Sequence, residues 1–154
     1  MKIDIIETHD GSHTLYLQEI DEHYHSTFGA IQESQHVFIQ AGFDLCKLRD
    51  IKVLEIGFGT GLNCYLTFLA NLSAHQNIHY FSIEKFPLSS EVWGKLNFSS
   101  YFPTNDSDLF SLIHLAPWNY DIEIDAKFVL RKVEADLLQW DSKDIPYDWS
   151  LRNG

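Results

Sequence analysis

The sequence predicts an α/β fold built around a parallel sheet, and three observations lead to this prediction. A short apolar segment, 53–56, runs directly into three closely spaced glycines, as a buried strand does when it delivers the chain to a tight loop. Apolar residues then recur at helical spacing over 62–72, and a second compact apolar segment follows at 78–83. Strand, glycine loop, helix and strand in this order form a βαβ unit, whose crossover should be right-handed and whose strands should be parallel.

The size and composition of the chain agree with one folded domain. It has 154 residues, of which 45% are hydrophobic and 14% aromatic, and this is ample for a buried core. Its 11 Lys and Arg against 22 Asp and Glu give a formal net charge of −11, which excludes a small basic nucleic-acid-binding module. The longest apolar stretches fall well short of the ~20 residues that a membrane-spanning helix needs.

Cysteine usage points to the cellular compartment. Cys46 and Cys64 offer neither a disulfide framework nor the spacing of a paired-thiolate metal site. No basic-then-apolar segment precedes them. We therefore expect a reduced, cytoplasmic protein without a membrane anchor.

A β-hairpin is expected at the N-terminus. Apolar residues alternate with polar ones in 3–5 and again in 15–17, and the pair Asp10-Gly11 between them suits turn positions with positive φ. The stretch 21–26 that follows is polar and has no periodicity, so its structure is left open.

A helix is expected next, within the N-terminal region 1–45. From about Gln32 the apolar residues recur at helical spacing, and they are Val37, Phe38 and Ala41. Gly42 is well placed to close this helix in the left-handed conformation that glycine adopts easily.

The region after the βαβ unit is less regular. We expect a helix over 91–96 after Pro87, and a second helix over 106–114 that Pro117 closes. Strands are expected around 122–124 and 128–130, with Val133 extending the latter to Asp136. The chain then stops where an open parallel sheet normally needs several more strands, so the later strands are expected to be missing.

The strongest chemical signal is the glycine loop after the first parallel strand. Gly57, Gly59 and Gly61 remove Cβ atoms where the backbone must turn sharply and where a ligand can lie against the main chain. The third glycine of the dinucleotide-binding fingerprint would fall at Leu62, one place later, so the loop fits a pyrophosphate poorly. Glu55, inside the strand, suits a ligand with a positive amino group better than one with phosphates. S-adenosylmethionine has such an amino group and no phosphate.

Two further acids are candidates for contacts to a nucleoside. Glu84 stands at the carboxyl end of the second parallel strand, where a carboxylate can accept hydrogen bonds from both ribose hydroxyls; the alternative is a solvated acid at a strand end. Asp136 is a candidate for the adenine amino group, and it suits equally well the N-cap of a helix over 137–140.

The sequence resembles a known family in several of these segments. Residues Glu55-Ile56-Gly57-Phe58-Gly59-Thr60-Gly61 look like motif I of class I S-adenosylmethionine-dependent methyltransferases. Four more segments, 21–26, 29–34, 37–38 and 80–88, are similar to a narrower family, the methyltransferase domain of the tRNA 5-methylaminomethyl-2-thiouridine modification enzyme and its stand-alone relatives. The similarity extends from about Asp10 to Asp148.

This resemblance implies both a fold and an activity. The implied fold is a single S-adenosylmethionine-binding domain over 1–154, in which an N-terminal β-hairpin precedes a Rossmann-like class I methyltransferase sheet at 51–148 with helices on both faces. The implied activity is methyl transfer from S-adenosylmethionine to the aminomethyl nitrogen of wobble 5-aminomethyl-2-thiouridine. The implied partners are the anticodon region of tRNA and a partner oxidase or another tRNA-modification protein.

The resemblance also implies site residues. Those expected to contact the cofactor are Glu55, Gly57, Phe58, Gly59, Gly61, Asn63, Glu84, Lys85 and Asp136, and those beside cofactor and substrate are Tyr24, Ser26 and Glu33. The family's expected catalytic carboxylate follows a Tyr-Asp pair that matches Tyr147-Asp148, but the chain then reads Trp149 to Gly154 and ends. We therefore expect a truncated member that is catalytically impaired and lacks later strands of its sheet.

Two other functions stay open at this stage. One is a dinucleotide-dependent oxidoreductase, which the displaced glycine disfavours. The other is a non-catalytic cofactor-binding or interaction module, which the absent catalytic carboxylate favours.

Two residue groups are expected to be structural. The histidines 23, 25 and 36 suit a metal site poorly because no cysteine accompanies them and the family needs no metal, so none is expected. Aromatic residues that could stack on bases are expected to pack in the core and loops, and they are Tyr101, Phe102, Trp118 and Tyr120.

Overall fold

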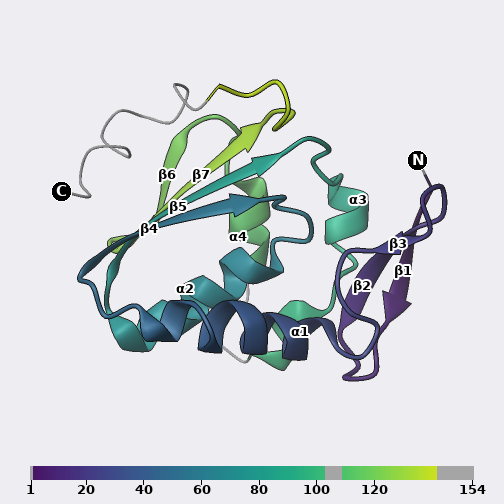
Figure 1. Ribbon diagram of the computed structural model, residues 1–154, viewed down its shortest axis with the longest axis horizontal. Helices are drawn as coiled ribbons and strands as arrows, with labels where there is room; N and C mark the ends of the chain where they lie inside the picture. The colour runs from purple at the N-terminus through teal and green to yellow at the C-terminus, as the bar shows by residue number, and fades with distance from the viewer. Residues whose placement is uncertain (1, 103–108, 142–154) are drawn as a thin grey trace.

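The computed structural model describes residues 2–102 and 109–141 and contains two β-sheets (Figure 1). The smaller sheet is antiparallel and consists of β1 (Ile3–Glu7), β2 (His13–Leu17) and β3 (Glu22–His23). This confirms the predicted hairpin and adds a short third strand in the stretch that periodicity left open. Gly11 alone of the predicted turn pair has positive φ, at 83°.

The larger sheet has the strand order β4-β5-β7-β6. Strands β4 (Asp50–Ile56), β5 (Asn77–Glu84) and β7 (Phe128–Glu134) are parallel, whereas β6 (Asp121–Asp125) runs antiparallel to β7. Helix α2 (Leu62–Ala74) connects β4 to β5. The predicted βαβ unit is therefore present, and all three of its elements lie where the apolar patterns placed them.

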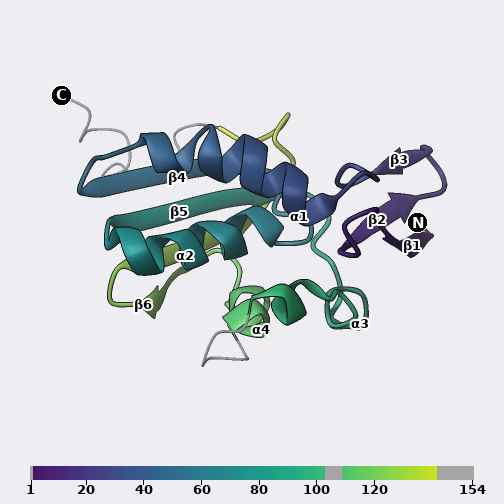
Figure 2. The ribbon, with the colours of Figure 1, turned by 90° about the horizontal axis from the view of Figure 1, so that it is seen from below.

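The helices that lie against the sheet cover one of its faces. Helix α1 (Ala30–Glu33) continues into the π-helix η1 (Ser34–Gln40), and this helical segment and α2 lie below the sheet in Figure 1. They lie in front of β4 and β5 in Figure 2, which views the molecule from below. Helix α4 (Leu109–Leu115) lies on this side too, because the side chain of Lys132 on β7 reaches its C-terminal end. The remaining short helices are α3 (Ser90–Trp93), η2 (Phe43–Leu45) and η3 (Phe98–Tyr101).

The core fills the space between the sheet and these helices. Tyr80 of β5 and Phe128 of β7 are fully buried and stack with ring centroids 5.9 Å apart, and Phe68 of α2 contacts Phe128. On the opposite face of the sheet, Phe81 is fully buried and contacts Trp140 in the segment after β7. Helices on this second face stay a prediction, because 142–154 lie outside the described residues.

Strand β4 differs from the buried strand that its apolar run predicted. Leu54 and Ile56 are 49% and 54% exposed, whereas Glu55 between them is only 6% exposed. Successive side chains of a strand point to opposite faces. Glu55 therefore lies on the face that α2 covers, while its two neighbours lie on the other face, on a strand that is the edge of the sheet among the described residues.

The predicted helix after Gln32 exists, but it starts at Ala30 and is mostly a π-helix. Gly42 does not close it in the left-handed conformation, because its φ is −122°. A Cβ on Gly42 would lie 2.7 Å from the carbonyl oxygen of Phe38. Glycine is therefore needed here for a close backbone approach rather than for positive φ.

The hairpin and this helix are joined by a polar contact. The carboxylate of Asp10 accepts hydrogen bonds from the backbone N–H of Ser12 and from that of Gln32, each 3.0 Å long. The hydroxyl of Thr8 accepts from the N–H of Ala30, and the hydroxyl of Ser12 from that of Ile31. Side chains of the β1–β2 turn thus satisfy the free N–H groups at the start of α1.

Several smaller predictions need correction or stay open. The helix expected over 91–96 is the shorter α3, and β7 ends at Glu134 rather than at Asp136. The start of the helix expected over 106–114, and the segment 142–154, lie outside the described residues. Of the four aromatics expected to pack, Phe102 and Trp118 do so, whereas Tyr101 and Tyr120 are 42% and 67% exposed. Among the described residues no helix is long and apolar enough to span a membrane.

Candidate functional site

The site begins at the glycine loop, which leaves the carboxyl end of β4. Gly57, Gly59 and Gly61 have φ of 87°, 52° and 73°, values that residues with a Cβ rarely adopt. The N–H of Gly57 donates to the carbonyl of Ile83 on β5 over 2.7 Å, which fixes the start of the loop. A Cβ on Gly57 would meet no atom within 4 Å, so the backbone at this point faces open space.

Glu84 lies against this loop. One oxygen of its carboxylate accepts a hydrogen bond from the N–H of Gly59 over 2.9 Å, and the other accepts from the N–H of Phe86 over 2.8 Å. Each contact joins an anionic acceptor to a backbone donor, and such bonds are stronger than neutral ones. The structure therefore brings together the two features that the sequence singled out, the glycine loop and the acid at the end of β5.

Thr60 ties the loop to two histidines from distant parts of the chain. Its hydroxyl lies 2.9 Å from Nε2 of His25, and its carbonyl accepts a hydrogen bond of 2.9 Å from Nε2 of His114. Burial lowers the pKa of each histidine to about 4, so both are neutral at pH 7. The ring of His114 is stacked on that of Trp93, with the ring centroids 4.7 Å apart, and this contact holds His114 in place.

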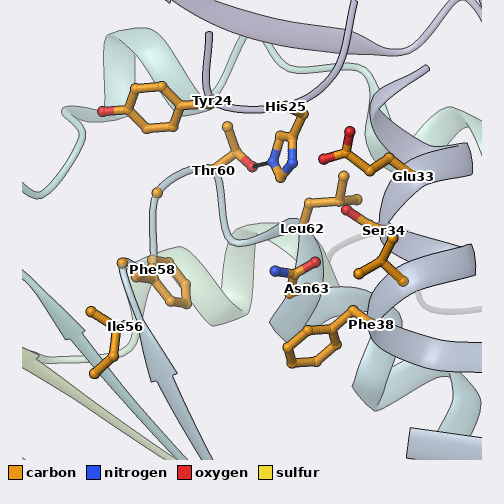
Figure 3. Close-up of a pocket in the computed structure, with 13 residues that line it drawn as sticks. Tyr24, His25, Glu33, Ser34, Phe38, Ile56, Phe58, Thr60, Leu62 and Asn63 are labelled. Carbon is orange, nitrogen blue, oxygen red and sulfur yellow. Dashed lines mark hydrogen bonds between the residues drawn. The ribbon is translucent and has the colours of Figure 1, made fainter. Parts of the chain in front are cut away.

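A cavity of about 280 Å³ lies between the loop and the helical segment α1–η1 (Figure 3). The loop and the first turn of α2 form one wall, α1–η1 forms another, and the segment before α1 contributes two side chains. The lining residues are Tyr24, His25, Glu33, Ser34, Val37, Phe38, Ile56, Gly57, Phe58, Gly59, Thr60, Leu62 and Asn63.

Two of the three residues proposed beside cofactor and substrate line this cavity. The ring of Tyr24 lies against Gly59, because a Cβ on that glycine would come within 3.1 Å of the ring. The carboxylate of Glu33 accepts a hydrogen bond of 3.1 Å from the backbone N–H of Ser26. Ser26 itself is not in the cavity wall, and its hydroxyl accepts from the N–H of Phe28.

Glu55 lies beneath the loop and is not in the cavity wall. Its two carboxylate oxygens accept hydrogen bonds of 2.7 Å from the hydroxyls of Tyr80 and Ser82, and Asn63 also bonds to it. Burial raises the pKa of Glu55 to about 7, and these hydrogen bonds oppose the shift. Its expected role as a direct contact to a ligand amino group stays a prediction.

Lys85 and Asp136 pair with each other. The ammonium of Lys85 lies 2.8 Å from the carboxylate of Asp136, which also accepts a hydrogen bond from the N–H of Leu138. Residues 137–139 form a turn rather than the helix considered for this position. The structure thus places both residues beside the end of β5, outside the cavity wall.

Phe58 and Asn63 differ in what their side chains face. Phe58 is 4% exposed, and its ring packs against His114 and Trp118 in the core, so only part of it meets the cavity. Asn63, on the first turn of α2, lines the cavity. Its amide oxygen is buried and has no hydrogen-bond partner among the described residues.

Sequence reasoning missed the contacts that hold the loop. From the sequence alone, His25 is considered only as a metal ligand, a role that is disfavoured, and no role is assigned to Thr60 or His114. Lys132 was also missed: it is 1% exposed, donates to the carbonyl of His114 over 2.7 Å and has a pKa lowered by burial to about 8. The one available signal is a lysine next to Arg131 in a strand whose other residues are mostly apolar.

The three histidines considered for a metal lie in different surroundings. His23 packs on Tyr16, His25 bonds to Thr60, and His36 lies 3.4 Å from Gln40. Within 2–102 and 109–141, no group of three or more His, Cys, Asp or Glu side chains is arranged to hold a metal ion.

Comparison with known proteins finds relatives of similar sequence, several of which share one name. A protein from Leptospira interrogans, named tRNA 5-methylaminomethyl-2-thiouridine biosynthesis bifunctional protein MnmC, is 35% identical over 86 residues, which are 51% of this chain and 13% of that protein. The protein of the same name from Idiomarina loihiensis is 40% identical over 80 residues, or 46% of this chain and 13% of that protein. No protein-family model matches the sequence.

A solved structure extends this similarity to most of the fold. The crystal structure titled MNMC2 from Aquifex aeolicus has a TM-score of 0.68 and 25% sequence identity, and the match covers 88% of this chain and 43% of that one. This chain therefore spans less than half of the solved relative and about an eighth of the bifunctional proteins. The similarities confirm the resemblance to the MnmC-related methyltransferase domain and to its mixed α/β fold.

Proposed function

We propose that the protein transfers a methyl group from S-adenosylmethionine to the aminomethyl nitrogen of a wobble uridine in tRNA. One observation carries the cofactor half of this proposal: the N–H of Gly59 bonds to the carboxylate of Glu84, so that an open glycine loop and a strand-end acid form one surface. The names of the relatives, which concern tRNA 5-methylaminomethyl-2-thiouridine biosynthesis, support the substrate half.

The residues present fit this cofactor. The space over Gly57 admits a ligand against the backbone, and Glu84 has acceptor lone pairs left for ribose hydroxyls. Among the described residues no lysine or arginine lines the cavity beside the loop, and Lys85 is already paired to Asp136, so a phosphate would find little compensation here. This charge distribution favours a phosphate-free nucleoside and disfavours the oxidoreductase alternative.

The main contribution of the protein to this reaction would be to position the two reactants. S-adenosylmethionine, when bound, supplies an electrophilic methyl group on a sulfonium. The cavity next to Gly57 would hold an amine in line with that methyl, with Phe38 and Leu62 helping to exclude water. Tyr24 and Glu33 are the polar side chains that would orient the amine, and Glu33 is an acceptor for its proton.

Two measurements test the proposal. S-adenosylhomocysteine should raise the melting temperature of the protein in a saturable way, whereas NAD at the same concentration should not. The protein should also transfer label from S-adenosyl-[methyl-³H]methionine to tRNA that carries aminomethyl-2-thiouridine, at a reduced rate if the impairment expected from the sequence holds, with fully modified tRNA as the control. Stabilisation by NAD alone would support an oxidoreductase, and cofactor binding without transfer would support the non-catalytic module.

A further inference from the structure

Two phenylalanines of the chain are exposed to water. The sequence has 11 phenylalanines, and all of them lie within the described residues. Nine are buried or half-buried, whereas Phe28 is 72% exposed and Phe86 is 57% exposed. A single exposed hydrophobic side chain is common on protein surfaces, so the positions of these two rings matter more than their exposure.

Phe86 lies directly after the end of β5, beside the glycine loop. Its backbone N–H donates to one carboxylate oxygen of Glu84, and the other oxygen accepts from the N–H of Gly59 in the loop. The ammonium of Lys85 lies 5.2 Å from the centroid of the Phe86 ring. Phe86 is thus connected to the glycine loop through one side chain.

Phe28 lies just before α1, beside the other wall of the cavity. Its backbone N–H donates to the hydroxyl of Ser26 over 3.2 Å, and the N–H of Ser26 donates to the carboxylate of Glu33 in the cavity wall. The ring of His9 contacts the Phe28 ring edge to face, with the centroids 5.3 Å apart. The N–H of His9 also donates to the carbonyl of Thr27, so this part of the hairpin supports Phe28.

The charges around the site limit how a nucleic acid could bind there. Among the described residues no lysine or arginine lines the cavity, Lys85 is paired to Asp136, and the whole chain has a formal net charge of −11. The phosphates of a nucleic acid would therefore gain little at this edge of the sheet. Bases can stack on aromatic rings without any charge on the protein, and such stacking tolerates any base.

A base that enters an enzyme pocket leaves its neighbours in the strand without their stacking partner. Proteins that bind single-stranded RNA loops replace this lost contact with aromatic side chains. An exposed ring next to each wall of the cavity is the arrangement that such a replacement needs, because the strand continues on both sides of the extruded base.

We propose that Phe28 and Phe86 form a stacking surface for the two bases that flank the target uridine in a single-stranded RNA loop. The proposal deepens the proposed function and rests on it for the identity of the RNA. It adds two residues outside the cavity wall, whose contacts are to bases that are not themselves modified.

The test is a double-mutant cycle between protein and RNA. Phe28→Leu and Phe86→Leu remove the flat ring and keep an apolar side chain and the backbone N–H. Tyr120→Leu is the matched control, because Tyr120 is 67% exposed and precedes β6, at the opposite edge of the described sheet from β4.

The RNA probe is a synthetic anticodon stem–loop with 5-aminomethyl-2-thiouridine at the wobble position. Two further versions carry an abasic site in place of the base before or after that position. Fluorescence anisotropy of the labelled RNA gives the affinities. Calorimetry with S-adenosylhomocysteine measures cofactor binding separately, and a thermal melt verifies folding.

The expected result is coupling between each ring and one flanking base. Phe28→Leu and Phe86→Leu should each weaken the intact stem–loop about tenfold, and removal of the facing base should weaken binding to wild type by a similar factor. Both changes together should cost no more than either alone, because they remove the same contact. Phe28→Trp and Phe86→Trp should retain the affinity for intact RNA, and Tyr120→Leu should bind as wild type does.

Other results separate this proposal from the proposed function. If wild type binds S-adenosylhomocysteine but the two Leu variants bind the stem–loop as wild type does, or if their losses simply add to those of the abasic sites, the stacking surface is refuted and the proposed cofactor stands. If the cycle shows coupling but wild type does not bind S-adenosylhomocysteine, the stacking surface stands and the proposed cofactor fails.

Three further outcomes would overturn the proposal. An equal loss in Tyr120→Leu would mean that any exposed ring contributes. Weaker binding of S-adenosylhomocysteine by Phe86→Leu, with RNA affinity unchanged, would assign Phe86 to the cofactor instead. A changed oligomeric state of Phe28→Leu in size-exclusion chromatography, again with RNA affinity unchanged, would assign Phe28 to a contact between proteins.

Discussion

Two glutamates at the ends of neighbouring strands show how differently one residue type behaves in two adjacent positions of a sheet. Glu55 near the end of β4 is 6% exposed and bonds to Tyr80, Ser82 and Asn63 inside the protein. Glu84 at the end of β5 accepts hydrogen bonds from the backbone N–H groups of Gly59 and Phe86, beside the loop but outside the described lining of the cavity. The resemblance assigned both to the cofactor.

The difference comes from strand geometry. Glu55 pairs in register with Ser82, and both point to the face that α2 covers, so this carboxyl group is enclosed. Glu84 is the last residue of its strand, and its side chain meets the loop instead of a helix. Position along the strand, rather than residue type, decides which acid can meet a ligand. Glu55 is therefore expected to govern the pH dependence of stability, and Glu84 the affinity for a ligand.

The largest expected effect is on the pH dependence of stability in Glu55→Gln. Folding raises the pKa of Glu55 from 4.5 to about 7, so the folded protein retains a proton that the unfolded chain has lost. Stability therefore falls as pH rises through this window, by about 1.4 kcal/mol per pH unit. Glu55→Gln removes this loss, so its free energy of unfolding relative to wild type should grow between pH 4.5 and 7 in urea titrations.

Two histidines act in the opposite direction and serve as an internal reference. The pKa values of His25 and His114 fall from 6.5 to about 4 on folding, so stability rises with pH between 4 and 6.5. Wild type and Glu55→Gln share this rise, so the difference between their free energies of unfolding reports on Glu55 alone. A difference that stays constant from pH 4.5 to 7 would mean that Glu55 is not held protonated.

The next effect is on ligand affinity. Glu84→Ala should weaken S-adenosylhomocysteine about 10- to 100-fold, because it removes charge-assisted hydrogen bonds worth about 1.5–3 kcal/mol. Glu84→Gln keeps one acceptor for the N–H of Gly59 and should lose less. Glu55→Gln should bind with nearly wild-type affinity at pH 7 in the same calorimetric titration. Equal losses in Glu55→Gln and Glu84→Ala would erase the distinction between the two acids.

The smallest effect concerns the glycine loop itself. Gly57→Ala and Gly59→Ala both place a Cβ at positive φ, which costs about 1–2 kcal/mol of stability. The methyl group of Gly57→Ala would enter open space that a ligand needs, whereas that of Gly59→Ala would press on the ring of Tyr24. In thermal melts, S-adenosylhomocysteine should no longer raise the melting temperature of Gly57→Ala. Without ligand, Gly59→Ala should have the lower melting temperature of the two variants. Full ligand stabilisation of Gly57→Ala would contradict the placement of the ligand.

The sequence predicts the βαβ unit well because each of its elements has a strong local signal. The apolar run before the glycines, the helical stripe from Leu62 and the apolar run before Glu84 each match an observed element. The loop–Glu84 contact follows as well, since parallel strands end at the same edge of a sheet. All three loop glycines have positive φ, in agreement with the sharp turn that the sequence predicts after the strand.

Other parts depend on contacts that no local pattern records. The exposure of Leu54 and the burial of Glu55 follow from which strands flank β4 and from the helix on one of its faces. The start of α1 depends on Asp10, which lies 22 positions away from Gln32 in the sequence. The hydrogen bonds to Thr60 come from His25 and His114, which lie 35 and 54 positions away from it in the sequence. Periodicity in a single segment cannot predict such pairings.

The central claim is that the loop over 57–61 and Glu84 together bind an adenosine-type cofactor, and the backbone amides of the glycines test it most directly. The sequence has eight glycines, so their resonances form a small set in a ¹H–¹⁵N NMR spectrum. On titration with S-adenosylhomocysteine, the amides of Gly57 and Gly59 should shift and saturate with one affinity, while those of Gly11 and Gly94 stay in place. The account would be contradicted if the amides of Gly57 and Gly59 showed no saturable shift. It would also be contradicted if only Gly11 or Gly94 shifted as the ligand saturated the protein.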